Sequence, residues 1–347
     1  MTISKLWVLR SLWSNEKHDQ KLTTTPSAAK PSAPKMSGIK KYIVTEPWLK
    51  LSCGLGEAPF WEDVTNTLRF VDIIKCNVHT VDLKKGPSSH KILANLDISI
   101  GVTGDIEGND SEFIFGGKHG YGRFNRSTAE YKYIRKVWDE AEIADGKESR
   151  MRANDGAVDS RGRFWVGFMT DPMVKDPVDE GILFRLDPDL TLHRMLSGVT
   201  IPNGTTWSAD DKTMYFADSP TKSIFAFDFD AETGKISNKR VFFTVPDDMG
   251  ENAVPDGHCM DEEGYMWTAI HGTGKVVRIS PESKVVAEIT LPTDQVTCPA
   301  FVGEDLIITS AGGDGSDPTS LAGSVFKVHV GVKGLKRYRF KENGEIV

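Results

Sequence analysis

The chain contains 347 residues, with 42 Lys and Arg against 49 Asp and Glu, which gives a formal net charge of −7. This acidic balance, with basic residues scattered along the sequence, argues against nucleic acid as a partner. No apolar run approaches the ~20 residues of a membrane-spanning helix, so we expect no membrane segment. The length exceeds that of most single domains, yet all-β domains with many short strands reach it as one unit.

The N-terminal residues differ in composition from the rest of the chain. Residues 1–20 are mildly basic and loosely amphipathic, and residues 22–38 are rich in Thr, Ser, Pro, Ala and Lys without apolar periodicity, so residues 1–38 are expected to form a disordered extension. Lys5 and Arg10 interrupt the first apolar residues and argue against a secretory signal peptide. We therefore expect one ordered domain over 39–347 and a cytoplasmic protein, or a mitochondrial one if the extension is a presequence.

The remaining chain predicts six similar units of short strands. One motif returns six times at roughly fifty-residue spacing, as LGEAPFW (55–61), VTGDIE (102–107), RANDGAVD (152–159), IPNGTTW (201–207), VPDGHCMD (254–261) and VTCPAFV (296–302). Alternating apolar runs follow each copy, such as TLRFVDI at 67–73 and TMYFAD at 213–218. Alternation between turn residues indicates antiparallel strands. We predict an all-β fold, a six-bladed β-propeller, closed when residues 39–45 pair as a strand with the last blade.

The third residue of each opening motif predicts a ring of side chains around the propeller axis. In chain order these residues are Glu57, Gly104, Asn154, Asn203, Asp256 and Cys298. Two carboxylates and two amide oxygens would then converge on the mouth of the channel, which is a suitable site for a divalent cation. Any single NG or DG dipeptide is more often a turn, but the shared repeat position favours the metal site.

The four cysteines, Cys53, Cys76, Cys259 and Cys298, have neither CxxC spacing nor the density of a disulfide framework. Reduced thiols in a cytosolic protein are the simpler interpretation, with a disulfide between Cys53 and Cys76 as an alternative. At Cys298 a soft thiol would suit zinc, whereas a small neutral side chain filling the ring is the competing interpretation.

The motifs together resemble the SMP-30/gluconolactonase family, also called the regucalcin-like family. The segments that carry the resemblance are LGEAPFW, RANDGAVDSRGRFWVGFM, IPNGTTWSADDKTMYFADS, VPDGHCMDEEGYMWTAI and SLAGSVFKVHVGVKG, which span about residues 50–335 in family order. The resemblance implies a six-bladed propeller with one catalytic divalent cation, Ca, Zn, Mn or Mg, and a sugar lactone as substrate.

The resemblance also implies roles for individual residues. The metal ligands of the family match Glu57, Asn203 and Asp256, and Arg152 and Asn154 match its substrate-binding residues. With few protein ligands the cation keeps open positions, so it would polarise the lactone carbonyl and stabilise the oxyanion. We interpret Asp256 as the residue that activates the attacking water. The alternative for Arg152 is a surface residue paired with a nearby acidic side chain.

One loop departs from the family pattern. Where lactone-hydrolysing members often carry a carboxylate-rich loop, the sequence here is TDPMVKDPVDEG, with Asp171 as its nearest acidic residue. His119 and His271 are interpreted as loop or channel histidines rather than ligands. Three hypotheses follow: a metal-dependent lactonase, a metal-dependent hydrolase of other esters such as organophosphates, or a non-enzymatic calcium-binding propeller. Because a closed propeller hides its own edges, we expect a monomer.

Overall fold

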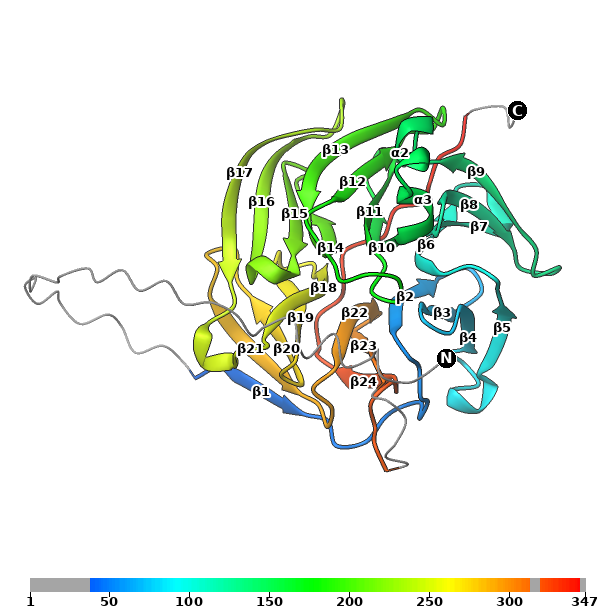
Figure 1. Cartoon of the computed structure of the whole chain (residues 1–347). Helices are drawn as coiled ribbons and strands as arrows, with labels where there is room; N and C mark the ends of the chain where they lie inside the picture. The colour runs from blue at the N-terminus through cyan, green and yellow to red at the C-terminus, as the bar shows by residue number, and fades with distance from the viewer. Residues whose placement is uncertain (1–37, 313–318, 344–347) are drawn as a thin grey trace, which may run out of the picture.

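The computed structural model describes residues 38–312 and 319–343, and their regular structure is almost entirely β-strand. Six sheets surround a central axis, so the predicted six-bladed propeller is confirmed (Figure 1). The predicted extension over residues 1–38 falls, except for Gly38, outside the described residues. Among the described residues, no helix has the length and apolar character needed to span a membrane.

The first three blades are regular four-stranded antiparallel sheets, each built from consecutive strands. Blade 1 contains β2 (Gly56–Glu62), β3 (Thr67–Asp72), β4 (Asn77–Asp82) and β5 (Lys91–Asn95). Blade 2 contains β6 (Ile100–Ile106), β7 (Asn109–Gly117), β8 (Gly120–Asn125) and β9 (Tyr131–Lys136). Blade 3 contains β10 (Met151–Val158), β11 (Phe164–Thr170), β12 (Gly181–Leu186) and β13 (Leu192–Val199).

The last three blades differ in strand number. Blade 4 contains β14 (Pro202–Trp207), β15 (Thr213–Asp218), β16 (Ser223–Asp230) and β17 (Lys235–Thr244). Blade 5 contains β18 (Val254–Met260), β19 (Met266–His271), β20 (Lys275–Ile279) and β21 (Val285–Thr290), with β1 (Lys40–Ile43) as a fifth strand. Blade 6 has three strands among the described residues, β22 (Val296–Val302), β23 (Asp305–Ser310) and β24 (Phe326–His329).

The helical segments are short and lie between blades or strands. The helices α2 (Glu140–Ala144) and α3 (Lys147–Arg150) precede β10, and 3₁₀ turns occur at η2 (Pro87–Ser89), η3 (Ser219–Thr221) and η4 (Asp247–Met249). Asp139 caps α2 by accepting a hydrogen bond from the backbone N–H of Glu142, whose side chain accepts one from the N–H of Asp139. This reciprocal capping begins the helix.

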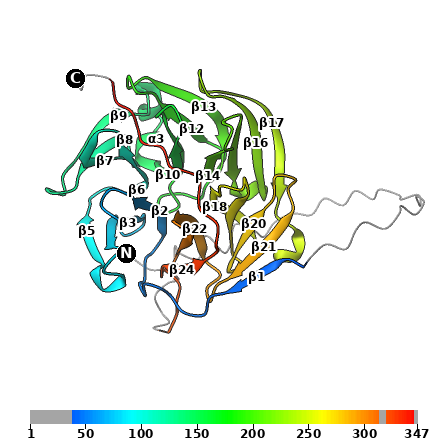
Figure 2. The ribbon, with the colours of Figure 1, turned by 180° about the vertical axis from the view of Figure 1, so that it is seen from behind.

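The N-terminal strand pairs with a different blade from the one predicted. β1 runs parallel to β21 of blade 5, from Lys40 opposite Ala287 to Ile43 opposite Thr290, and does not join the last blade (Figure 2). Blade 6 is reached further along, where the backbones of Leu49 and Val325 exchange two hydrogen bonds of 3.0 Å. β1 is largely exposed, as suits a strand at an outer edge, whereas Leu49 is buried.

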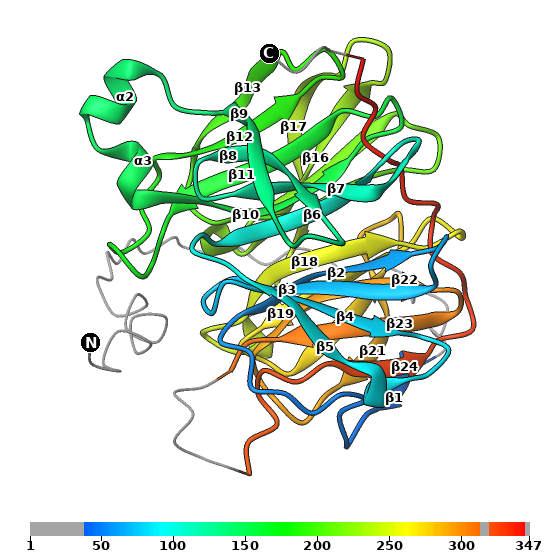
Figure 3. The same ribbon diagram turned by 90° about the vertical axis from the view of Figure 1, so that its right-hand side faces the viewer.

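The apolar core lies between neighbouring blades. The largest cluster joins side chains from blades 1, 2 and 3, and it also contains Phe340 from the C-terminal segment. That segment pairs with the end of β18 at Gly334 and with the end of β6 at Phe340. It crosses the face of the propeller opposite to α2 and α3 (Figure 3). The C-terminal segment and the two helices therefore lie on different faces of the propeller.

Candidate metal and substrate site

A β-bulge interrupts each innermost strand close to the predicted ring position. The ladder to the next strand shifts at Glu57/Phe60, Ile100/Val102, Ala153/Gly156, Asn203/Thr205, Pro255/His258 and Val296/Pro299. Bulges leave residues unpaired and redirect their side chains. In blade 2 the bulge falls at Gly101, so the prediction of Gly104 as a ring member is wrong. Gly104 lies three residues further along and faces Val158 and Ile114.

The backbone after the two ring residues Glu57 and Asn203 is left-handed. Ala58 has a φ of 48° and Gly204 a φ of 37°. A positive φ is uncommon for a residue other than glycine, and such conformations cluster at functional sites. Glycine is required at position 204 for a second reason, because a Cβ there would lie 2.1 Å from Nδ1 of His258.

The two amides of the ring are ordered by a chain of hydrogen bonds that crosses three blades. Asn154 Nδ2 donates to Asn203 Oδ1 at 2.8 Å and to the carbonyl oxygen of Pro202 at 2.9 Å. Asn203 Nδ2 donates to Ser219 Oγ at 2.8 Å, and the Ser219 hydroxyl donates to the carbonyl oxygen of Pro255 at 2.7 Å. Since Asn203 Oδ1 can accept two hydrogen bonds, a lone pair remains for a cation.

Three buried carboxyl groups stand close enough to repel one another. Burial, followed by the charges of Asp256 and Asp155, raises the pKa of Glu57 well above its ordinary value. Burial and Asp155 likewise raise the pKa of Asp256, and burial raises the pKa of Asp155 to about 6. A divalent cation among these carboxylates would relieve the repulsion. Hard oxygen donors of this kind fit calcium, magnesium or manganese.

Each ring carboxylate is held by the backbone that follows it. Glu57 Oε2 accepts a hydrogen bond from the N–H of Ala58 at 2.9 Å, and Asp256 Oδ1 accepts one from the N–H of Gly257 at 3.0 Å. The other oxygen of each carboxylate is left for a different partner. Asn154 and Asn203 are therefore in direct contact, and the charges of Glu57 and Asp256 interact.

Arg152 is buried beside the ring and is not a surface residue. Its Nη1 donates to Asn154 Oδ1 and to the carbonyl oxygen of Ala153, both at 2.8 Å. Its Nε lies 3.7 Å from Asp171 Oδ1, and Asp171 Oδ2 lies 3.2 Å from Lys118 Nζ. The alternative of a surface residue is wrong, and the loop carboxylate Asp171 contacts Arg152.

The two histidines weighed in the sequence occupy different surroundings. His271 Nδ1 lies 3.6 Å from Asp256 Oδ2 and 3.0 Å from the carbonyl oxygen of Val296. Burial lowers the pKa of His271, so its imidazole is neutral at pH 7. Its Nδ1–H then donates to the carbonyl oxygen of Val296. His119 instead lies 3.5 Å from Glu148. His271 is thus a histidine beside the predicted ring, as the sequence indicated, whereas sequence reasoning missed Ser219, which belongs to no repeated motif.

A cavity of about 630 Å³ lies in the channel on the other side of the ring, against the C-terminal segment. Asp155, His258, Cys298 and Arg337 are among its lining residues, whereas Glu57, Asn203 and Asp256 are not. Cys298 is buried, and burial raises the pKa of its thiol, so it fills the channel wall as a neutral group. The candidate site is thus defined by the ring itself.

Known proteins similar to this chain share both its sequence pattern and its fold. A family model for the SMP-30/gluconolactonase/LRE-like region matches residues 55–312. Regucalcin from Bos taurus is 32% identical over 322 residues, which cover 88% of this chain and 99% of the relative. A solved luciferin-regenerating enzyme has a TM-score of 0.73 and 29% identity, covering 84% of this chain and 96% of that chain. A gluconolactonase from Xanthomonas campestris, at 19% identity and a TM-score of 0.61 over 82% of this chain and 88% of that one, shares the fold.

Proposed function

The chain belongs to the SMP-30/gluconolactonase/LRE-like family, and we propose that it hydrolyses sugar lactones with one divalent cation held by Glu57, Asn203 and Asp256. The observation that supports this proposal is that the buried carboxyl groups of Glu57, Asp155 and Asp256 interact and that the amides of Asn154 and Asn203 are hydrogen-bonded to each other. Without a bound cation this arrangement costs free energy, because burying like charges without a counter-ion is unfavourable. A bound cation would repay this cost.

The chain supplies binding, orientation and proton transfer around the cation. When bound, the cation supplies a Lewis acid that polarises the lactone carbonyl. Asp256 would accept the proton of the attacking water, because the N–H of Gly257 holds Oδ1 and leaves Oδ2 for the proton, and because burial and the charge of Asp155 raise its pKa. Glu57 holds the cation and balances its charge. Arg152 and Asn154 bind substrate oxygens, with the planar guanidinium fixed in place by Asn154 and Asp171.

Two other functions use the same ring. Hydrolysis of another ester, such as an organophosphate, needs the same polarising cation and differs only in the groups that contact the substrate. A calcium-binding propeller without enzymatic activity needs the cation ligands but not Arg152. The burial of Arg152 beside the ring favours an enzyme. Burying a guanidinium costs free energy, and a contact with bound substrate would offset that cost. We propose that the partner of the protein is a small-molecule lactone substrate. We also propose that the protein acts as a monomer in the cytoplasm.

A panel of sugar lactones and esters assayed with calcium, magnesium, manganese and zinc tests the proposal. We expect hydrolysis of at least one lactone, loss of that activity with a chelator, and recovery on adding a cation. Calcium binding without turnover of any substrate would support the calcium-binding function instead. Hydrolysis that a chelator leaves unchanged would contradict the role of the cation.

A further inference from the structure

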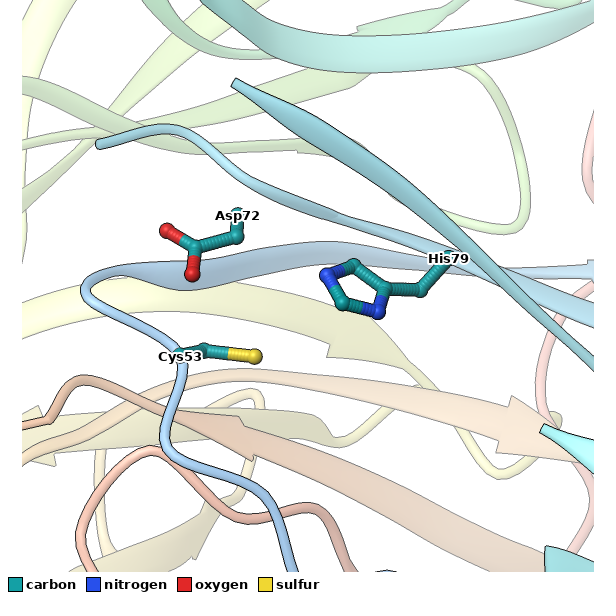
Figure 4. A group of neighbouring side chains, drawn as sticks. All are labelled: Cys53, Asp72 and His79. Atoms are coloured by element: carbon teal, nitrogen blue, oxygen red, sulfur yellow. The ribbon is translucent and has the colours of Figure 1, made fainter. Parts of the chain in front are cut away.

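A second group of metal-ligand side chains lies in blade 1, away from the ring. Cys53 precedes β2, Asp72 ends β3, and His79 lies within β4 (Figure 4). One potential ligand atom from each residue lies within 4.8 Å of those of the other two. The side chains are nearly inaccessible, with 3%, 1% and 4% of their respective residue surfaces exposed. A thiol, a carboxylate and an imidazole therefore meet in a closed pocket.

The imidazole of His79 has a buried nitrogen without a partner. Nε2 makes no hydrogen bond to any residue that the structure describes, although buried polar atoms nearly always have one. On the other side of the ring, Nδ1 lies 2.9 Å from Nε2 of His90. If Nδ1 carries the proton and donates it to His90, Nε2 carries a free lone pair. Histidine ligands of metals are oriented in this way by a hydrogen bond from their other nitrogen.

The equivalent positions of blade 4 lack the thiol and the imidazole. Asp72 accepts hydrogen bonds from the backbone N–H groups of residues 54 and 55, and Asp218 accepts them from residues 200 and 201 at the matching place. In the strand pairing Phe70 faces His79, and Phe216 faces Phe225. The counterparts of Cys53 and His79 are therefore Val199 and Phe225. The aspartate is common to both blades, and only blade 1 adds a thiol and an imidazole.

We propose that Cys53, Asp72 and His79 bind a zinc ion that stabilises blade 1. Thiolate, imidazole and carboxylate together suit zinc, whereas calcium and magnesium prefer oxygen ligands only. Ligands around one tetrahedral zinc lie roughly 3–4 Å apart, given bonds of about 2.0–2.3 Å, so a small contraction closes the site. The proposal is independent of the function proposed for the ring.

The hydrogen bonds of Asp72 leave room for such an ion. Among the residues that the structure describes, Oδ1 accepts from the N–H groups of Leu55 and Lys75, whereas Oδ2 accepts only from the N–H of Gly54. Oδ2 therefore keeps a lone pair for a metal. Without a metal, burial and Asp72 raise the pKa of Cys53 to about 12, so the thiol is neutral and binding of zinc would release its proton.

The same three residue types also resemble a cysteine nucleophile with its base and orienting carboxylate. A nucleophile must reach a substrate and must ionise, and burial prevents both for Cys53. A buried site with three protein ligands, whose fourth position a water would complete, instead ties the segment before β2 to β3 and β4. Its expected consequence is a more stable first blade, because binding to the folded state adds to stability.

Cobalt substitution tests the site, since cobalt bound by a thiolate has a charge-transfer absorption that oxygen ligands do not produce. We expect the intact chain, with excess calcium present, to bind one cobalt per chain with this absorption. Zinc should displace the cobalt and raise the melting temperature. The double substitution Cys53→Val with His79→Phe copies the filling of blade 4, so the variant should fold, lose the absorption and show no zinc-dependent rise.

Two control variants separate this site from other thiols and from the ring. Cys76→Ala, in the same blade, and Asp256→Asn, in the ring, should both keep the thiolate absorption and the zinc-dependent rise. Loss of lactone hydrolysis in Asp256→Asn with the absorption intact would show that the two sites are independent. Absence of the absorption in the intact chain, or its survival in Cys53→Ala, would overturn the proposal.

Discussion

At the scale of single residues, the side chains of the ring come from one position of the repeated motif. Residues outside the motif orient them. The sequence identifies Glu57, Asn203 and Asp256 as the candidate oxygen donors, because each occupies the same position of a repeated motif. Ser219, which orders Asn203, could not be predicted, and neither could the contact of His271 with Asp256. Their contacts depend on how neighbouring blades meet, and no repeated pattern records that.

Arg152→Ala tests the proposed substrate contact. The substitution removes a guanidinium that touches Asn154 and Asp171 but supplies no ligand to the cation. We expect KM for the lactone to rise by about 10-fold or more, with cation affinity unchanged, because the contact is to substrate. Steady-state kinetics and calorimetric cation titration measure the two effects.

Arg150→Ala is the matched control, because Arg150 pairs with Glu180 and Asp145 outside the ring. Its KM should stay close to that of the parent. A parental KM in Arg152→Ala as well would remove Arg152 from the substrate site.

The affinity for the ring cation should depend on pH. Burial and the charges of Asp256 and Asp155 raise the pKa of Glu57, and burial and Asp155 raise that of Asp256, so protons compete with the cation. Affinity should therefore increase as pH rises through the raised pKa values and decrease toward acid. Calcium titrations between roughly pH 5 and pH 8 measure this.

Glu57→Gln removes one of the competing protons, so its affinity should be lower overall and change less with pH. An affinity that does not vary with pH in the parent would mean that these carboxyl groups are already ionised without the cation.

At the scale of elements, the predicted inner strands are found in every blade, but two pairings could not be predicted. The alternating pattern identifies a strand but not the strand it pairs with. The sequence therefore predicts that residues 39–45 pair with the last blade, whereas β1 pairs with blade 5. The bulges likewise have no sequence signature strong enough to distinguish Gly101 from Gly104.

The contact between blades 1 and 2 depends on Arg69. Its fully buried guanidinium pairs with Glu62 and with Asp105, the latter at 3.1 Å, and lies 4.2 Å from the ring centre of Phe113. Arg69→Ala would remove the fully buried partner of both carboxylates and leave Arg126 as their cationic partner, 3.1 Å from Glu62 and 2.9 Å from Asp105. We expect the free energy of unfolding to fall by about 3 kcal/mol, measured by urea denaturation.

The exposed pair of Lys212 and Asp210, 3.9 Å apart, provides the control. Lys212→Ala should leave the unfolding midpoint nearly unchanged, because exposed ion pairs contribute little. A similarly small effect of Arg69→Ala would show that the blade contact does not depend on the ion pair.

At the scale of the whole molecule, the C-terminal segment crosses the face of the propeller opposite to α2 and α3 (Figure 3), and its residues 333–339 line a cavity that Glu57, Asn203 and Asp256 do not line. Phe340 is fully buried in the core shared by blades 1 to 3, and its backbone bonds to Asp105 and Glu107. Phe340→Ala should destabilise the fold by about 3–5 kcal/mol, whereas turnover of the folded protein should stay near the parental value. Urea denaturation and a lactone assay at low temperature separate the two effects.

Tyr338→Ala, two residues earlier at a more exposed position, should cost much less stability. A loss of turnover in folded Phe340→Ala would instead connect the C-terminal segment to the site. The closed ring itself could be predicted from the number of repeats, whereas this segment, which has no motif, could not.

The central claim is that lactone hydrolysis depends on Asp256 within the oxygen ring, and turnover of Asp256→Asn at saturating cation tests it most directly. The substitution keeps the shape of the side chain and removes the proposed base, so turnover should fall by at least about 10²-fold, while the variant remains folded and still binds cation at high concentration. Asp210→Asn, at an exposed position, should retain the parental rate. Parental turnover in cation-saturated Asp256→Asn would contradict the account.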